Sequence, residues 1–236
     1  MPSLRSAAWT SIGKKILTGV TGLGLSLFVL LHLLGNLTYF DSDPNAINKY
    51  SHFLHELGPI FYILEIVLLV SIILHIILGI TIYLRRKKLR PVDYDVSATR
   101  GGPSKKNFSS KTMIWTGILL LIFIVIHLQT FKWGPGVGEG YIATEAGEQL
   151  LVDGKPVKDV HTRITEVFKK EGYVIGYVLV MIFLGFHLRH GIWSAFQSLG
   201  ANNPKLSPIL YMVGGIFAVL IAFGFIFLPI YIYFFV

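Results

Sequence analysis

The residues most able to do chemistry in this sequence are histidines that lie within long apolar segments. The chain has eight histidines, and four of them fall one to a segment, at His32, His75, His127 and His187. An ionisable side chain at membrane depth is costly and is usually functional. A neutral imidazole is a good metal ligand, and ligation removes the cost of leaving it unpaired in apolar surroundings. These four residues are therefore the first candidates for a metal or cofactor site.

The elements that must position these histidines are five apolar runs, at about 12–40, 59–84, 112–131, 172–196 and 207–235. Each run reaches or exceeds the roughly 20 residues that a membrane-spanning helix needs. The runs are too continuous for the alternating strands of a barrel. The sequence predicts an all-α integral membrane protein, with five transmembrane helices in a single bundle over residues 1–236.

Charge and cysteine content narrow the class of protein further. The net charge is +8, but the basic residues gather before the first run, directly after the second (RRKKLR, 85–90), in the 91–111 loop and at Lys205. The positive-inside rule then places the N-terminus in the cytoplasm and, after five crossings, the C-terminus outside. This distribution favours anionic lipid or an acidic partner over nucleic acid. The absence of cysteine excludes disulfides, thiolate-bound iron–sulfur clusters and covalently attached haem.

The depths of the four histidines fall into two levels. Helices one and three run outward, and their histidines lie about 25 Å beyond the cytoplasmic edge at a rise of about 1.5 Å per residue. Helices two and four run inward, and their histidines lie about 15 Å before that edge. The outer level therefore holds His32 and His127, and the inner level holds His75 and His187.

Two levels of paired imidazoles are what two haem groups stacked across a membrane require. Each iron would take one imidazole from each of two helices, leaving no open position, which suits electron transfer. Gly35, Gly79 and Gly191 follow three of the histidines at helical spacing, so a flat porphyrin could lie close to the backbone there.

A lone intramembrane histidine more often forms an interhelical hydrogen bond. A transporter also uses buried histidines, but usually with several intramembrane carboxylates and broken helices, whereas Glu65 is the only acid well inside a run.

Two segments outside the runs have their own predicted structure. Residues 41–59 predict a short helix on the outer surface, begun by Asp43-Pro44 and carrying an apolar stripe of Phe53, Leu54 and Leu57.

The outer insertion, about 132–171, predicts a hairpin that turns at Asp153-Gly154. It also predicts an amphipathic helix on the outer membrane face, with Ile164, Val167 and Phe168 at helical spacing. No nucleotide-binding, hydrolytic or zinc motif is present in it or elsewhere.

The motifs around the histidines resemble a known family. They are LHLLGN (31–36), LHIILGITIYL (74–84), VIHLQTF (125–131) and FHLRHGIWSAFQSLG (186–200). In order and spacing, over essentially the whole chain, they are similar to the five-helix di-haem cytochrome b membrane anchor of bacterial succinate dehydrogenase and fumarate reductase (succinate:quinone oxidoreductase). The most specific pattern is F-H-x-x-x-G-hydrophobic-W in the fourth run. The outer insertion is longer than in the simplest members.

The resemblance implies a set of ligands for two haem b groups. The axial ligands fall on His32 and His127 for the outer haem, and on His75 and His187 for the inner haem. His190 lies about 4.5 Å further along the helix than His187, so it cannot occupy the same coordination site. The resemblance instead gives Arg189 and His190 to the haem propionates or to the partner near the cytoplasmic surface.

The resemblance also implies a respiratory complex in the bacterial cytoplasmic membrane. A flavoprotein with bound FAD interconverts succinate and fumarate, and an iron–sulfur subunit connects it to this multi-pass chain. The chain is expected to transfer electrons to or from quinone, usually menaquinone, with no catalytic residue of its own toward succinate or fumarate. A higher oligomer of the complex is compatible with this expectation. The alternatives are the di-haem cytochrome b of a formate, hydrogen or nitrate enzyme, and a transporter without haem.

A quinone site needs a cleft with hydrogen-bond donors and a protonatable group. We favour the outer end of the bundle, which offers Asn36, Tyr39, His52, His55 and Glu56. The inner end offers Trp193, Ser194 and Gln197.

Overall fold

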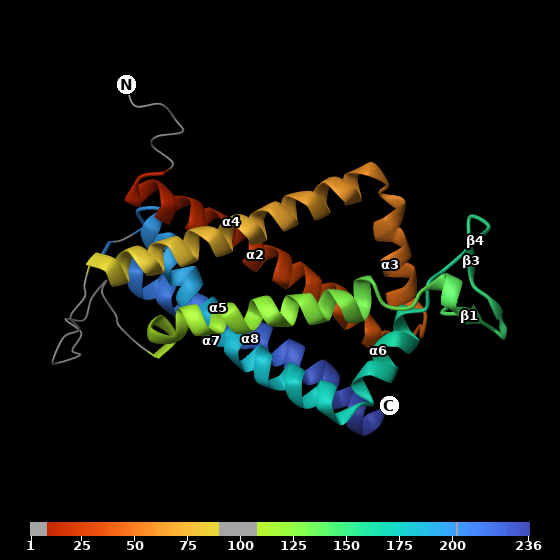
Figure 1. The fold of residues 1–236 in the computed structure, drawn as a ribbon. Helices are drawn as coiled ribbons and strands as arrows, with labels where there is room; N and C mark the ends of the chain where they lie inside the picture. Colours follow the sequence, from red (N-terminus) through yellow and green to blue (C-terminus); the bar gives the residue numbers. More distant parts are fainter. Residues whose placement is uncertain (1–8, 90–107, 202) are drawn as a thin grey trace. The chain divides into compact units, whose positions relative to one another are not determined.

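Five long helices dominate the computed structural model, which describes residues 9–89, 108–201 and 203–236 (Figure 1). They are α2 (Ser11–Leu37), α4 (Pro59–Leu89), α5 (Phe108–His127), α7 (Glu171–Ser198) and α8 (Leu206–Phe235). Helix α2 continues as a 3-10 turn, η1 (Thr38–Phe40), and α5 continues as a π-helix, η3 (Leu128–Lys132). All five are long and apolar enough to cross a membrane. The prediction of five spanning-length helices is confirmed.

Two helix boundaries differ from the prediction. Helix α4 runs through the basic cluster to Leu89 rather than ending near residue 84. Arginine and lysine are good helix formers, and positive charge is favourable in the last turn of a helix. Helix α5 begins at Phe108 rather than 112, so residues 108–111 are not loop. The basic residues Arg5, Arg90, Arg100, Lys105 and Lys106 lie outside the described residues.

The chain divides into two compact units, and each long helix contributes one part to each unit. The first unit comprises the described residues within Met1–Phe28, Val67–Leu119 and Phe183–Leu220. The second unit comprises Val29–Ile66, Leu120–Ile182 and Ile221–Val236.

Close helix contacts at small residues hold the first unit together. A Cβ on Gly19 of α2 would lie 3.3 Å from the Ala195 backbone of α7, and one on Gly214 of α8 would lie 3.1 Å from Ile192. Small residues at such crossings let apolar helices approach closely without needing a hydrophobic driving force. This unit is also strongly basic. Its described residues hold no Asp or Glu and nine cationic side chains: Lys14, Lys15, Arg85, Arg86, Lys87, Lys88, Lys111, Arg189 and Lys205.

The second unit has the larger apolar core, which includes the helix α6 (Val160–Phe168) of the outer insertion. Asp159 caps α6 by accepting a hydrogen bond from the Thr162 N–H at 2.9 Å. Ile164, Val167 and Phe168 are all buried in the core with Tyr177 and other side chains. The predicted amphipathic stripe is confirmed, but it packs on protein rather than lying on a membrane face, because α7 and α8 supply apolar partners for it.

The short helix predicted between the first two runs is α3 (Ala46–Glu56), and Asn48 marks the side that packs on protein. Phe53 is 56% exposed, whereas Asn48 is 2% exposed. The Asn48 side chain explains this orientation. Its Oδ1 accepts hydrogen bonds from the backbone N–H groups of Val160 and His161 at 2.8 and 2.9 Å, which fastens α3 to the start of α6.

The start of α3 also differs from the prediction. The helix begins at Ala46, after the expected Asp43-Pro44 signal, because the Asp43 carboxylate accepts from the Asn45 N–H in a local turn instead of capping the helix.

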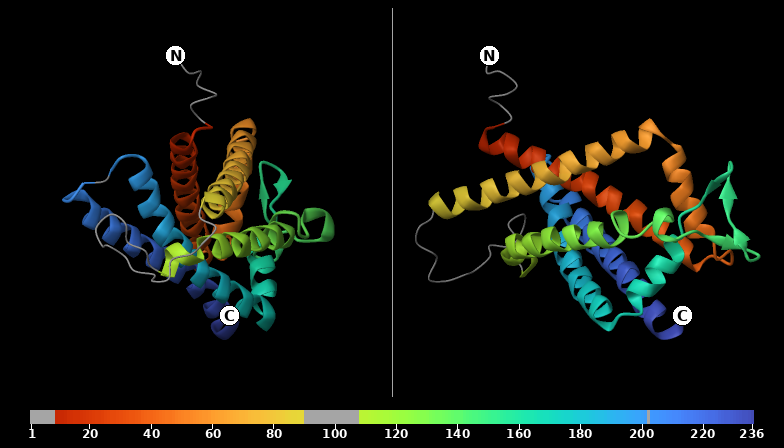
Figure 2. Two further views of the ribbon diagram at one scale, coloured as in Figure 1. Left: turned by 60° about the vertical axis from the view of Figure 1, so that its left-hand side comes forward. Right: turned by 45° about the vertical axis from the view of Figure 1, so that its right-hand side comes forward.

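Two small hairpins complete the insertion and lie beside α3 (Figure 2). Strand β1 (Thr144–Glu145) pairs antiparallel with β2 (Glu148–Gln149), and β3 (Leu151–Val152) pairs with β4 (Lys155–Pro156), while η4 (Val137–Glu139) precedes them. The predicted turn at Asp153-Gly154 is confirmed, with both residues at positive φ. The turn at Ala146-Gly147 is a second hairpin that the sequence analysis missed, because Ala-Gly is not a typical signal for this turn.

Candidate functional site

The structure brings His32 and His127 together within the second unit. Their ring centres are 5.8 Å apart and the rings are perpendicular. His32 comes from α2, and His127 is the last residue of α5 before the π-helix η3. Phe123 and Phe131 lie 5.4 and 5.2 Å from the His127 ring, and Phe225 lies 5.9 Å from the His32 ring. The two imidazoles therefore face each other in an aromatic surrounding.

The second pair, His75 and His187, lies within the first unit. The ring centres of these residues, from α4 and α7, are 6.4 Å apart, with 64° between the ring planes. Two glycines, one on α2 and one on α5, lie close to these rings. A Cβ on Gly22 of α2 would lie 3.1 Å from Cε1 of His75, and one on Gly117 of α5 would lie 3.5 Å from Cε1 of His187. Both imidazoles thus lie directly against a neighbouring helix backbone.

The glycines predicted to make room for a porphyrin give a mixed result. A Cβ on Gly79 or Gly191 would meet no atom within 4 Å. A Cβ on Gly35 would lie 2.6 Å from the Tyr50 ring of α3. The expectation for Gly35 is wrong, because the space beside it is filled by a tyrosine from a segment whose position the sequence pattern does not give.

Hydrogen bonds determine which nitrogen of His75 and His187 carries the proton. Nδ1 of His75 is 3.2 Å from the Thr21 hydroxyl, which donates its single proton to the Leu17 carbonyl at 2.8 Å. The hydroxyl must then accept from Nδ1–H. The Thr18 backbone is a further hydrogen-bond partner of this ring.

The same arrangement occurs at the other imidazole of this pair. Nδ1 of His187 is 3.1 Å from the Thr116 hydroxyl, which donates to the Met113 carbonyl at 3.0 Å. With both hydroxyl protons on helix carbonyls, each neutral ring would carry its proton on Nδ1 and its lone pair on Nε2, which is a metal-binding tautomer.

The His127 ring has a different partner. Its Nδ1 lies 3.1 Å from the hydroxyl of Tyr177 on α7, a buried residue of the second unit's core. Phe168 of α6 packs edge-on against Tyr177 at 4.9 Å. The outer insertion is thus connected through Tyr177 to one of the candidate ligands.

The spacing of each pair can be compared with that of two imidazoles on one metal. With metal–nitrogen bonds of about 2 Å and about 1.2 Å from nitrogen to ring centre, two rings on opposite sides of a metal are about 6.4 Å apart. The observed 6.4 Å between His75 and His187 equals this separation, and the 5.8 Å between His32 and His127 is about 0.6 Å shorter. Among the described residues, no group of three or more His, Cys, Asp or Glu could hold a bare metal ion. A metal at either pair would need its other ligands from a macrocycle such as haem.

Polar side chains on α5 and α7 of the first unit could receive an anionic group. Arg189 donates to the Tyr211 hydroxyl at 3.0 Å and lies over its ring, in a unit whose described residues include no acid. Ser109 is buried, and its hydroxyl has no hydrogen-bond partner among the described residues. It lies two helical turns before Thr116, on the same face of α5. His190 is half-buried beside Arg189. Ser109 was missed in the sequence, where a serine near a helix start gives no such signal.

The predicted quinone residues do not form one cluster. Tyr39 is buried, stacks on His161 at 4.4 Å and shares a hydrogen bond with Thr165. His52 and Glu56 form a pair on α3 at 3.2 Å.

The other two members of the predicted quinone set form hydrogen bonds with nearby backbone carbonyls. Asn36 donates to the His32 carbonyl and His55 bonds the Ser51 carbonyl. At the opposite end, Trp193 is buried against Tyr211, and Ser194 and Gln197 are half-buried.

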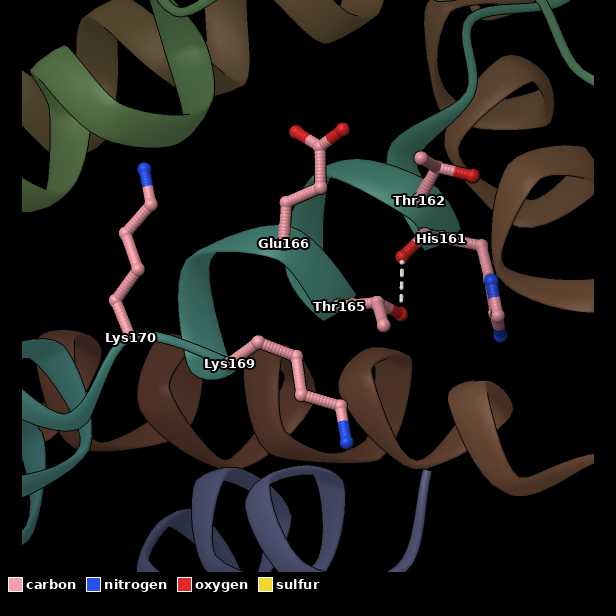
Figure 3. A pocket seen from close by; sticks show the side chains of 6 residues that line it. All are labelled: His161, Thr162, Thr165, Glu166, Lys169 and Lys170. Atoms are coloured by element: carbon pink, nitrogen blue, oxygen red, sulfur yellow. Dashed lines mark hydrogen bonds between the residues drawn. The ribbon is translucent and has the colours of Figure 1, made fainter.

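One hollow on the structure runs along α6 and contains none of these candidates. It is lined by His161, Thr162, Thr165, Glu166, Lys169 and Lys170. In Figure 3 the ammonium groups of Lys169 and Lys170 point to opposite sides of the helix. Lys169 reaches the Tyr233 carbonyl near the end of α8. The two cations therefore do not converge on a common ligand.

Glu65, the acid that lies well inside the second run, has a partner. It forms an ion pair with Lys132, the last residue of η3. Such a pair lowers the cost of each charge in an apolar surrounding. π-Helical turns inside long helices are frequent at functional sites, and this one follows His127 directly.

Comparisons of the chain with models of protein families, with characterised proteins and with solved structures find no match.

Proposed function

We propose that this chain is the di-haem cytochrome b and membrane anchor of a succinate:quinone oxidoreductase. In this proposal it transfers electrons between an iron–sulfur subunit and membrane quinone, most simply menaquinone. It is the subunit of that respiratory enzyme that does not bind dicarboxylates. The observation that carries the proposal is the pair of facing imidazoles in each unit, with ring centres 5.8 and 6.4 Å apart.

The residues assigned to the cofactors follow from these pairs. His32 and His127 would hold one haem b, and His75 and His187 the other, each through Nε2. When bound, each haem supplies a one-electron carrier whose iron has no open coordination position. Arg189, His190 and Ser109 would hold the propionates of the haem at His75 and His187, because an anionic group would balance Arg189 in a unit whose described residues hold no acid.

The charge distribution supports a multi-pass placement in a bacterial cytoplasmic membrane. The described acids all belong to the second unit, and the nine cations of the first unit have no acid beside them in that unit. By the positive-inside rule the first unit faces the cytoplasm, with the N-terminus, and the second faces outward, with the C-terminus. The FAD-bearing and iron–sulfur partners would dock at the basic side.

The quinone-facing residues are the least specified part of the proposal. Of the outer set, the exposed His52–Glu56 pair is the best placed to exchange a proton with a quinone. Tyr39 and Asn36 serve packing and local hydrogen bonds instead.

The test is a reduced-minus-oxidised spectrum of the purified chain with haem quantitation. We expect a b-type spectrum and two haems per chain. Replacing His32 or His127 by Ala should remove one haem, and replacing His75 or His187 should remove the other. His190→Ala, on the same helix face, should keep both haems with their iron ligands unchanged, because it removes only a propionate contact. A chain without haem would refute the proposal, and a haem lost in His190→Ala but kept in His187→Ala would refute the ligand assignment.

A cytochrome b of another respiratory enzyme is the second candidate, because the paired imidazoles alone do not specify the dicarboxylate partner. Co-purification separates the two: a flavoprotein partner supports the first, and a molybdenum or nickel partner supports the second.

A further inference from the structure

A Thr-Gly dipeptide occurs on each of the two helices that pack against the His75–His187 pair without contributing a ligand to it. Thr21-Gly22 lies on α2 and faces His75, and Thr116-Gly117 lies on α5 and faces His187. In both places the threonine bonds the ring at Nδ1 and the glycine lies beside Cε1 of the same ring. The same local device therefore serves both imidazoles.

The single proton of each threonine hydroxyl determines the direction of the hydrogen bond between that hydroxyl and the ring. A threonine hydroxyl has one proton, and here that proton is donated to a carbonyl of the same helix, that of Leu17 or Met113. The oxygen can then only accept from the ring. Neutral histidine in water prefers the opposite tautomer, with the proton on Nε2. The threonines thus select the form whose Nε2 is unprotonated.

We propose that Thr21 and Thr116 are positioning residues that hold His75 and His187 as Nδ1–H tautomers, with Nε2 ready to coordinate a metal between them. The identification of that metal as haem iron rests on the proposed function, but the tautomer itself exists without the cofactor. Hydrogen bonds to the second nitrogen of a ligating imidazole fix its orientation and raise its basicity. The pair is therefore arranged for ligation before the cofactor binds.

The His127 ring has a different partner. It bonds the phenol of Tyr177 instead of a helix-bonded threonine. The His127 ring should therefore not respond to substitution of Thr21 or Thr116.

The first test uses the full chain in detergent without haem, with histidine labelled at both ring nitrogens. Nitrogen NMR at pH 7 should show His75 and His187 with a protonated Nδ1 and an unprotonated Nε2, assigned by loss of each signal in His75→Phe and His187→Phe. Thr21→Val should shift His75 alone toward Nε2–H, and Thr116→Val should shift His187 alone. Thr21→Ser and Thr116→Ser should restore the original signals.

Thr81→Val is the matched control. Its hydroxyl also lies on a helix of the first unit and bonds only its own helix, at the Ile77 carbonyl. We expect no change at either histidine. Both rings protonated on Nε2 in the native chain, or no response to the two Val variants, would overturn the inference whether or not the chain binds haem.

A second test uses the haem-loaded chain. Loss of an outer hydrogen bond of this kind typically lowers metal affinity about 10- to 100-fold. Thr21→Val and Thr116→Val should each weaken retention of one haem by that factor and raise its midpoint potential, with the second haem unchanged. A chain that never binds haem refutes the proposed function alone. Normal haem retention and potential in both Val variants refute the positioning role alone.

Discussion

The two glycines beside the His75–His187 pair give a prediction with an internal control. A Cβ on Gly22 would lie 3.1 Å from Cε1 of His75, and a Cβ on Gly117 would lie 3.5 Å from Cε1 of His187. Carbon atoms attract best at about 3.5–4.0 Å. Gly117→Ala would therefore meet its histidine at an ordinary contact distance, whereas Gly22→Ala would be about 0.4 Å too close.

The magnitudes follow from two opposing effects. Replacing glycine by alanine inside a helix gains about 1 kcal/mol, and overpacking a well-fitted site costs about 1–3 kcal/mol. The His75 ring cannot easily move away, because Thr21 and the Thr18 backbone hold it on the same side. Gly117→Ala should therefore be neutral or stabilise the chain by about 1 kcal/mol. Gly22→Ala should be less stable than Gly117→Ala by about 1–3 kcal/mol.

The assay measures both stability and ligation. Unfolding in denaturing detergent, followed by circular dichroism, gives the stability difference between the two variants. If the haem proposal holds, the same 1–3 kcal/mol would appear as about 5- to 150-fold weaker haem retention in Gly22→Ala than in Gly117→Ala. Equal effects of the two substitutions, or a larger effect at Gly117, would refute the described packing of α2 on His75.

Three further predictions concern the second unit. Asn48→Leu should destabilise it by about 2–5 kcal/mol, because two N–H groups at the start of α6 lose their acceptor; hydrogen exchange over 160–168 should speed up, and unchanged protection would contradict this. If the haem proposal holds, Tyr177→Phe should lower retention of the haem at His127 about tenfold with the other haem unaffected, read from haem content after dilution. The third is pH dependence: hydrogen bonds from Asn45 and Lys49 lower the pKa of Asp43 from its ordinary 3.8. The stabilising contribution of the Asp43 carboxylate is thus present above pH 3.8 and is lost as the pH falls through the pKa of the folded state, which lies below 3.8. Protection of the hairpin amides from hydrogen exchange should therefore fall over that pH range in the native chain but not in Asp43→Asn.

The helices and the histidine pairs could be predicted from the sequence because both depend on local or additive quantities. A continuous apolar run needs no knowledge of its neighbours to indicate a spanning-length helix. The rise per residue is constant, so counting from the basic residues to each histidine brought the correct partners to the same depth. The structure places the rings of His32 and His127 together, and those of His75 and His187, as that counting predicts.

The features that the sequence analysis missed share a physical cause. In each case a contact with a second helix determines the local structure. Gly35 was expected to leave space, but Tyr50 of α3 fills it. Asn48 of α3 was not singled out, but it faces inward because it has polar partners on α6. Thr21 and Thr116 were missed because a threonine in an apolar helix usually bonds only its own backbone. The repeated Thr-Gly dipeptide was the signal that could have found them.

The contrast between the two units bears on how the chain would work in a membrane. Among its described residues, the first unit combines two threonine-bonded imidazoles with nine cations, Arg189 included, and no acid. The second combines an aromatic surrounding, a phenol partner for His127 and all the described acids. A positive surrounding stabilises the reduced, less positive form of a redox centre, whereas raised imidazole basicity favours the oxidised form. Within the His75–His187 site these two effects oppose each other, so removing the threonine bonds and removing the charge of Arg189 should move its midpoint potential in opposite directions. A shift of the same sign for Thr116→Val and Arg189→Gln would show that one of the two contacts does not act on the cofactor.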